Sequence, residues 1–115
     1  MSISADKLHL LDFSDAVVRG RRLRTRHPGL LLAELLNELA ISQAELARSI
    51  GVSPMRVSHI VKGKRPVTAD VALRLGRRFR QSPQYWLNLQ SRYDLDRALD
   101  EIGRPALFAI EPVAA

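Results

Sequence analysis

The chain has 115 residues, which is the usual size of a single domain. Hydrophobic residues make up 46% of it and aromatic residues only 5%, so its core must be built from aliphatic side chains, a composition that favours helices over a β-sandwich. The absence of cysteine excludes disulfides, thiolate metal sites and thiol catalysis. The formal net charge of +6 suits a nucleic-acid partner, although a basic surface can also serve solubility alone.

Residues 1–26 form an extension in which scattered apolar and acidic residues precede a basic run. Its apolar residues near helical spacing predict a short helix. The five arginines between positions 19 and 26 predict a basic linker, or a solvated hinge. The extension lacks the apolar core of a signal peptide, and the apolar runs of the chain are too short to span a bilayer. We therefore expect a cytoplasmic protein with no membrane partner.

Capping signals predict two helices directly after this extension. Pro28 suits the first turn of a helix, and the leucines at positions 32, 35, 36 and 39 form one apolar stripe along it. Ser42 and Glu45 form an S-x-x-E capping box, which predicts the start of a second helix. Gly51 suits the left-handed residue that ends a helix.

Three more helices are predicted by the same signals. Ser53 can cap a helix with Pro54 in its first position, and Gly63 ends that helix. Thr68 caps the next helix, where the charge of Asp70 suits the helix dipole. The last helix runs over about residues 83–102.

The predicted fold class is all-α, a compact five-helix bundle. It divides into an N-terminal extension (1–26), a helical domain (27–103) and a short C-terminal tail (104–115). For the tail, a short strand, a docking segment and disorder all remain open.

The connection "GVS" between the second and third helices predicts a helix-turn-helix. A link this short, led by a glycine, makes two helices cross steeply. Ala47 is small where the helices would pass closest, and Val52 can turn back into the core. The alternative is a helical bundle in which this turn occurs by chance.

"SQAELARSIGVSPMRVSHIVKGKR" resembles the helix-turn-helix of Cro/repressor-like regulators. "HPG" at 27–29, "GKRPVTADVALRLGRRF" at 63–79 and "SPQYWLNLQSRYDL" at 82–95 look like the HigA-type antitoxins of toxin–antitoxin modules. The resemblance implies a homodimer that binds a palindromic operator, represses its own operon and neutralises a small, basic, RelE-like toxin that cuts mRNA. It covers residues 27–95. The 26-residue extension and Leu30 after Gly29 depart from the family pattern.

In a helix-turn-helix the third helix enters the major groove, and its first residues face base edges. Arg56 is the predicted base reader, through O6 and N7 of a guanine, with a phosphate contact as the alternative. In similar proteins a glutamine at the position of Gln43 contacts a phosphate. The basic residues beyond the third helix suit the DNA backbone. The predicted DNA-binding residues are Gln43, Ser53, Pro54, Met55, Arg56, Ser58, His59, Lys62, Lys64 and Arg65.

Two further surfaces are predicted for protein partners. The last helix is the expected place for pairing of two copies, through Trp86, Leu89 and Tyr93, although a single tryptophan more often belongs to the core. A toxin calls for an acidic surface, which either the extension or the acidic last helix offers. We favour the extension, unless it packs on the protein's own core. Its predicted toxin-binding residues are Leu10, Phe13, Asp15 and Val17.

No catalytic constellation is predicted. His9, His27 and His59 lack metal-ligand spacing, and the glycines form no phosphate-binding loop. We therefore expect neither an enzyme nor a cofactor nor a metal. Two other functions remain open: a stand-alone phage-type repressor without a toxin, and a protein-interaction module that no longer binds DNA. The lack of acids between residues 46 and 69 argues against the second of these.

Overall fold

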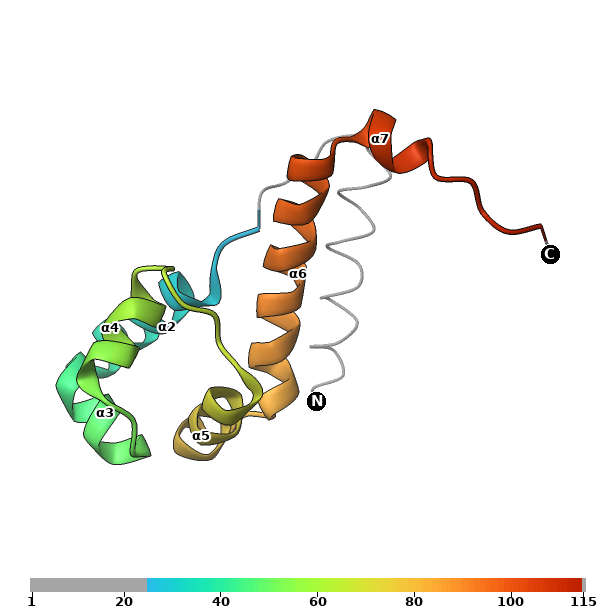
Figure 1. Ribbon diagram of the computed structural model, residues 1–115. Coiled ribbons are helices and arrows are strands. Elements are labelled where there is room, and N and C mark those ends of the chain that lie inside the picture. Colours follow the sequence, from blue (N-terminus) through green and yellow to red (C-terminus); the bar gives the residue numbers. More distant parts are fainter. Residues whose placement is uncertain (1–24, 115) are drawn as a thin grey trace.

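The computed structural model describes residues 25–114, and that part of the chain contains helices and no strand (Figure 1). The predicted all-α class and its five helices are confirmed. The predicted helix in the extension lies outside the described residues. The elements are α2 (Pro28–Leu39), α3 (Gln43–Ile50), α4 (Pro54–Val61), α5 (Ala69–Phe79), α6 (Pro83–Ile102) and α7 (Arg104–Phe108).

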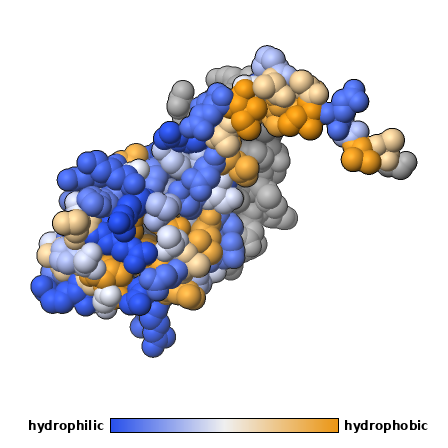
Figure 2. Space-filling view, viewed as in Figure 1, coloured by the Kyte–Doolittle hydropathy of each residue, from blue (hydrophilic) through white to orange (hydrophobic). Residues whose placement is uncertain are grey.

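The C-terminal tail begins with the short helix α7, so of its three predicted alternatives the strand and the disorder do not describe this part. Gly103, at φ 83°, separates α7 from α6. In Figure 1 the helices α2 to α5 gather beside one half of α6, and the C-terminus leads away beyond its other end. Figure 2 shows hydrophobic residues concentrated at this far end, where Phe108 and Ile110 are largely exposed.

The core lies where α2 to α5 meet the first half of α6. As the composition predicts, it is aliphatic, with a single aromatic residue, Trp86, among its buried members. Burial of these side chains is the main term that stabilises a domain of this size. The buried apolar residues are Leu32, Leu36, Leu46, Ala47, Ile50, Val57, Ile60, Val67, Val71, Ala72, Leu75 and Trp86.

The first turn of α2 lies directly against the last turn of α4. A Cβ atom added to Gly29 would lie 1.8 Å from the carbonyl oxygen of Ile60, so only glycine allows this approach. The contact joins the start of the domain to the end of the helix that the sequence assigns to DNA reading. It gives a physical reason for the glycine of "HPG" at the start of α2.

We expect Gly29→Ala to destabilise the protein by about 1–3 kcal/mol, because the methyl group must push α2 away from α4. Chemical denaturation of the variant measures the free energy of unfolding. Leu30→Ala is the matched control, because Leu30 is 46% exposed and its truncation opens no buried cavity. Equal stability of the two variants would show that the close contact does not constrain the fold.

Candidate nucleic-acid interface

Helix α3 is held at both ends by the residues that the sequence predicts. The Ser42 hydroxyl accepts a hydrogen bond from the N–H of Glu45, and the Ser42 N–H donates to the Glu45 carboxylate, both at 3.0 Å. The bond from the Ser42 N–H lowers the pKa of Glu45 below its ordinary value. At the other end, Gly51 adopts φ 75° and its N–H donates to the carbonyl of Ala47. Gln43 is thus the exposed first residue of a fixed helix.

Helix α4 presents its first turn to solvent. The Ser53 hydroxyl accepts a hydrogen bond from the backbone N–H three residues further on, at 3.1 Å. Val57 and Ile60 are buried, so the opposite side of the helix faces outward. Met55 at the tip is 67% exposed, and Pro54 beside it is exposed too. The other predicted contact residues of this helix are partly buried: Arg56, Ser58 and His59.

Arg56 is tied to the start of α5. Its Nη2 donates to the Thr68 hydroxyl at 3.2 Å, and its Nη1 lies 3.6 Å from Asp70 Oδ2. The other carboxylate oxygen of Asp70 accepts a bond from Arg74 Nε at 3.0 Å. Arg74 in turn donates to the carbonyl of Ile50, at the end of α3, at 2.7 Å. These contacts form one polar chain that links α3, α4 and α5.

These contacts give Asp70 a second structural role. The sequence assigns it only to the dipole of its own helix, whereas its carboxylate also anchors the predicted base reader. The i, i+4 spacing of Asp70 and Arg74 is readable in the sequence. The pairing of Asp70 with Arg56 is not, because the turn between α4 and α5 brings them together.

The basic residues beyond α4 lie on a tightly hydrogen-bonded turn. The N–H groups of Lys64 and Arg65 both donate to the carbonyl of His59, at 2.8 and 3.2 Å. Gly63 adopts φ 75°, which allows the chain to reverse. The side chains of Lys62, Lys64 and Arg65 are exposed. Lys62, Lys64 and Arg65, three of the predicted phosphate-contacting residues, therefore lie on one turn of fixed backbone, next to α4, the helix predicted to read bases.

His27 packs against this basic turn. In the sequence it is one of three scattered histidines. It is 6% exposed, and its Nδ1 accepts a hydrogen bond from the N–H of Gly29 at 2.8 Å, which caps α2. Its ring packs edge-on against Tyr93, 5.0 Å between ring centres, and lies under Gly63. Burial lowers the pKa of His27, against the opposing effects of the Asp94 charge and of a hydrogen bond with the Arg65 backbone.

Gln90, on α6, binds the backbone of the segment that follows the basic turn. Its buried side-chain oxygen accepts a hydrogen bond from the N–H of Val67 at 2.8 Å, and its amide nitrogen donates to Asp94 at 2.9 Å. A buried backbone N–H without a partner would cost about 1–3 kcal/mol. His27 and Gln90 together fix the basic turn on α6. Neither role is visible in the sequence, because both depend on partners that are remote along the chain.

The predicted pairing residues of α6 face the protein's own interior to different degrees. Trp86 is 1% exposed and its indole N–H donates to Gln81 at 2.8 Å, so it offers no surface to a second copy. Leu89 and Tyr93 are half-buried. A role of these two in pairing stays a prediction. The predicted toxin-binding residues lie outside the described part of the chain: Leu10, Phe13, Asp15 and Val17.

Other kinds of site were considered for the described residues alone. Residues 25–114 contain no group of three or more histidine, cysteine or acidic side chains that could hold a metal ion. None of the helices in this range combines the length and apolar character needed to cross a membrane. The described residues do present the exposed first turn of α4 beside the basic turn that follows this helix.

This geometry, two helices crossing at a glycine-led turn with the second one exposed at its start, is that of a helix-turn-helix protein. The helix-turn-helix family profile matches residues 32–86. Virulence-associated protein I of Dichelobacter nodosus is 47% identical over 73 residues, which are 63% of this chain and 68% of that protein.

Two solved structures share the fold over their whole length. A HigA-family antidote protein from Coxiella burnetii is 40% identical, with a TM-score of 0.76, and covers 79% of this chain. The Pseudomonas aeruginosa antitoxin HigA, solved with the higBA promoter, is 46% identical, with a TM-score of 0.74, and also covers 79%. The chain belongs to the HigA family of helix-turn-helix antitoxins. The two solved relatives are an antidote protein and an antitoxin, in agreement with the prediction that the chain is not an enzyme.

We expect stability to fall as the pH drops below about 6.5, the ordinary pKa of histidine. The unfolded chain takes up a proton on His27 near that pH, whereas the folded chain does so only at a lower pH, so protonation favours unfolding. Denaturation at pH 7.5 and pH 5 measures the loss. His27→Asn retains a capping oxygen without this titration, so its loss should be smaller. An equal loss in both proteins would contradict the role of His27.

Proposed function

We propose that the chain binds operator DNA as a homodimer, represses its own operon and neutralises a cognate RelE-like toxin in the cytoplasm. The observation that carries the DNA part is the exposed first turn of α4 beside the basic turn that follows it. Support comes from relatives with the same fold that were solved on DNA. They include a Pseudomonas aeruginosa protein with its operator and the antitoxin GraA with its operator, at TM-scores of 0.73 and 0.74.

In this proposal α4 enters the major groove with Pro54 and Met55 foremost. Their apolar surfaces suit the methyl group of a thymine. Gln43 contacts one phosphate from the start of α3, where backbone N–H groups also point outward. Lys64 and Arg65 contact the backbone on the other side of the groove. Phosphate contacts set the position of the protein, and base contacts set the sequence it selects.

Arg56 can read a base while it keeps its contacts to α5. Each terminal nitrogen of a guanidinium carries two N–H groups, and Thr68 and Asp70 each engage a different one. Donors therefore remain on both nitrogens. The carboxylate of Asp70 repels phosphate and holds the guanidinium in one orientation. Both effects favour a base contact over a phosphate contact for Arg56.

We expect Arg56→Ala to relax the sequence preference at one position of the operator, at a cost of about 1–3 kcal/mol on the preferred site. Lys64→Ala should weaken binding to all sequences alike and reduce the salt dependence, because it removes only a phosphate contact. Gel shifts on the chain's own promoter and on single-base variants, at several salt concentrations, measure both effects.

Asp70→Asn is the matched control for this experiment, because it keeps the shape of the side chain and removes its charge. We expect it to strengthen binding to unrelated DNA and to narrow the gap between specific and non-specific sites. If Arg56→Ala and Lys64→Ala weaken all sequences equally, Arg56 is not a base reader. If no shift occurs even at low salt, the protein does not bind this DNA and the interaction-module alternative gains.

The toxin part of the proposal rests on membership in the HigA family. We expect the small reading frame next to this gene to encode a protein that stops growth when expressed alone and is harmless when co-expressed with this chain. Growth with each gene separately and together measures it. A neighbour that is harmless alone, or is not rescued, would leave the stand-alone repressor as the better function.

A deletion of residues 1–18 tests where the toxin binds. The shortened chain should lose rescue and retain the promoter shift, since the DNA-binding residues lie elsewhere. Full rescue by the shortened chain would move the toxin contact to another surface, for which the acidic half of α6 is the alternative.

A further inference from the structure

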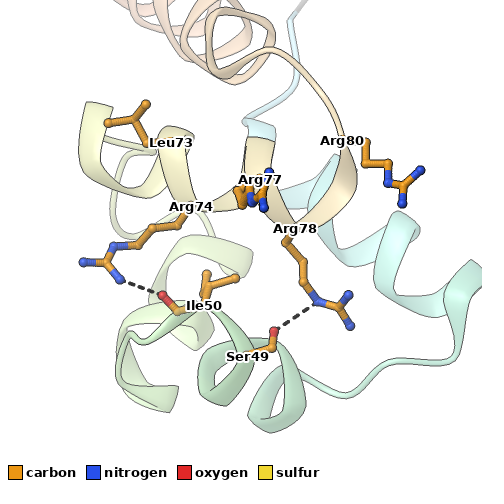
Figure 3. Close-up of a pocket in the computed structure, with 7 residues that line it drawn as sticks. All are labelled: Ser49, Ile50, Leu73, Arg74, Arg77, Arg78 and Arg80. Carbon is orange, nitrogen blue, oxygen red and sulfur yellow. Dashed lines mark hydrogen bonds between the residues drawn. The ribbon is translucent and has the colours of Figure 1, made fainter.

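A pocket of about 700 Å³ opens between the C-terminal end of α3 and the outer side of α5 (Figure 3). None of the described residues that line it is acidic. Its apolar part is formed by Ile50 and by Leu73, which is 61% exposed. Its polar part contains Ser49 and four arginines from one seven-residue stretch: Arg74, Arg77, Arg78 and Arg80.

Two of these arginines are held in place by α3. Figure 3 shows Arg74 and Arg78 reaching from α5 to α3, where Arg74 donates to the carbonyl of Ile50 and Arg78 Nε donates to the Ser49 hydroxyl at 3.1 Å. The bond of Arg78 leaves its terminal nitrogens available. Within residues 25–114, no ion pair involves Arg77, Arg78 or Arg80. Among the described residues, the positive charge of the pocket is compensated at Arg74, by its ion pair with Asp70, and in part at Arg78, whose charge interacts with that of Glu45.

The helix dipole of α5 does not account for this set. Cations in the last turn of a helix stabilise it, which explains Arg77 and Arg78. Arg80 lies beyond that turn, at the left-handed C-cap with φ 57°, where glycine is the preferred residue. The left-handed conformation is less favourable for an arginine than for a glycine. The arginine also adds a fourth positive charge to the rim of the pocket.

We propose that this pocket binds an acidic polypeptide segment, with its carboxylates on Arg77, Arg78 and Arg80 and an apolar side chain on Leu73. The planar guanidinium presents paired N–H groups that match a carboxylate. The apolar surface beside the charges suits a side chain rather than a phosphate backbone. A RelE-like toxin is basic, so the ligand is a different partner. The inference does not depend on the proposed toxin.

The location of the pocket also favours a peptide over operator DNA. The predicted phosphate contacts lie at the N-terminal end of α3 and beyond the C-terminal end of α4, whereas the pocket lies at the C-terminal end of α3. Eight residues of helix put about 12 Å between the two ends of α3. The pocket is nevertheless connected to the proposed base-reading turn, because Arg74 binds Asp70, the partner of Arg56, and only residues 51–53 separate Ile50 from α4.

The test uses the full chain and a short fluorescent peptide of repeating Glu-Glu-Leu units, with a Gln-Gln-Leu peptide as the neutral counterpart. Fluorescence anisotropy at low salt should detect binding of the acidic peptide only. The double variant R77Q/R80Q should weaken that binding about tenfold or more, since it removes two charge-assisted contacts. It should leave the affinity for operator DNA unchanged. The matched double variant K64Q/R65Q should do the reverse.

Arg80→Gly separates binding from folding. It should raise the Tm, because glycine suits the left-handed cap, and yet weaken peptide binding. Equal peptide binding by the wild type and R77Q/R80Q would overturn the proposal. So would a loss of DNA affinity in R77Q/R80Q as large as that in K64Q/R65Q, because phosphates would then be the ligand of the pocket.

Discussion

The contact between the first turn of α2 and the last turn of α4 is the constraint on which the proposed DNA-reading surface depends. Gly29 lets the two backbones meet at the Ile60 carbonyl, and His27 caps α2 while its ring supports the basic turn at Gly63. Both residues precede the helix-turn-helix in the chain, yet they contact its last turn and the basic turn that follows it. A buried, neutral histidine suits this place because its ring accepts one hydrogen bond and fills apolar space. Protonation removes the acceptor, so the support depends on pH.

Electrostatics divide the surface of the domain into two basic regions with different surroundings. Near α4 the basic residues are accompanied by Asp70, which restrains Arg56 and links three helices through Arg74. An exposed ion pair of this kind adds at most about 1 kcal/mol to stability, so its effect is mainly on orientation. On the outer side of α5, no ion pair involves Arg77, Arg78 or Arg80 within residues 25–114. Arginine therefore helps to orient other groups in the first region, and in the second region most arginines have no ion-pair partner among the described residues.

Features that depend on near neighbours could be predicted from the sequence. The capping box of Ser42 and Glu45, the caps at Ser53 and Thr68 and the glycine turn at Gly51 all join residues within one turn of a helix. Their stereochemistry is local, so the sequence contains it. The predicted outward position of Met55 follows from the same helical period. The contacts of Arg56 with Asp70, of His27 with Tyr93 and of Gln90 with Val67 were not predictable in this way, because these partners are remote along the chain.

The sequence by itself determined the five helices, the glycine-led turn and the membership in the HigA family, because these rest on local caps, apolar spacing and a characteristic motif order. The tertiary structure decided which polar side chains meet: Arg56 with Asp70, His27 with Tyr93, and Gln90 with Val67. It also placed Trp86 in the core and assembled the arginine pocket from α3 and α5. The physical reason is that helix packing brings remote residues within hydrogen-bond range, and no local rule specifies that packing.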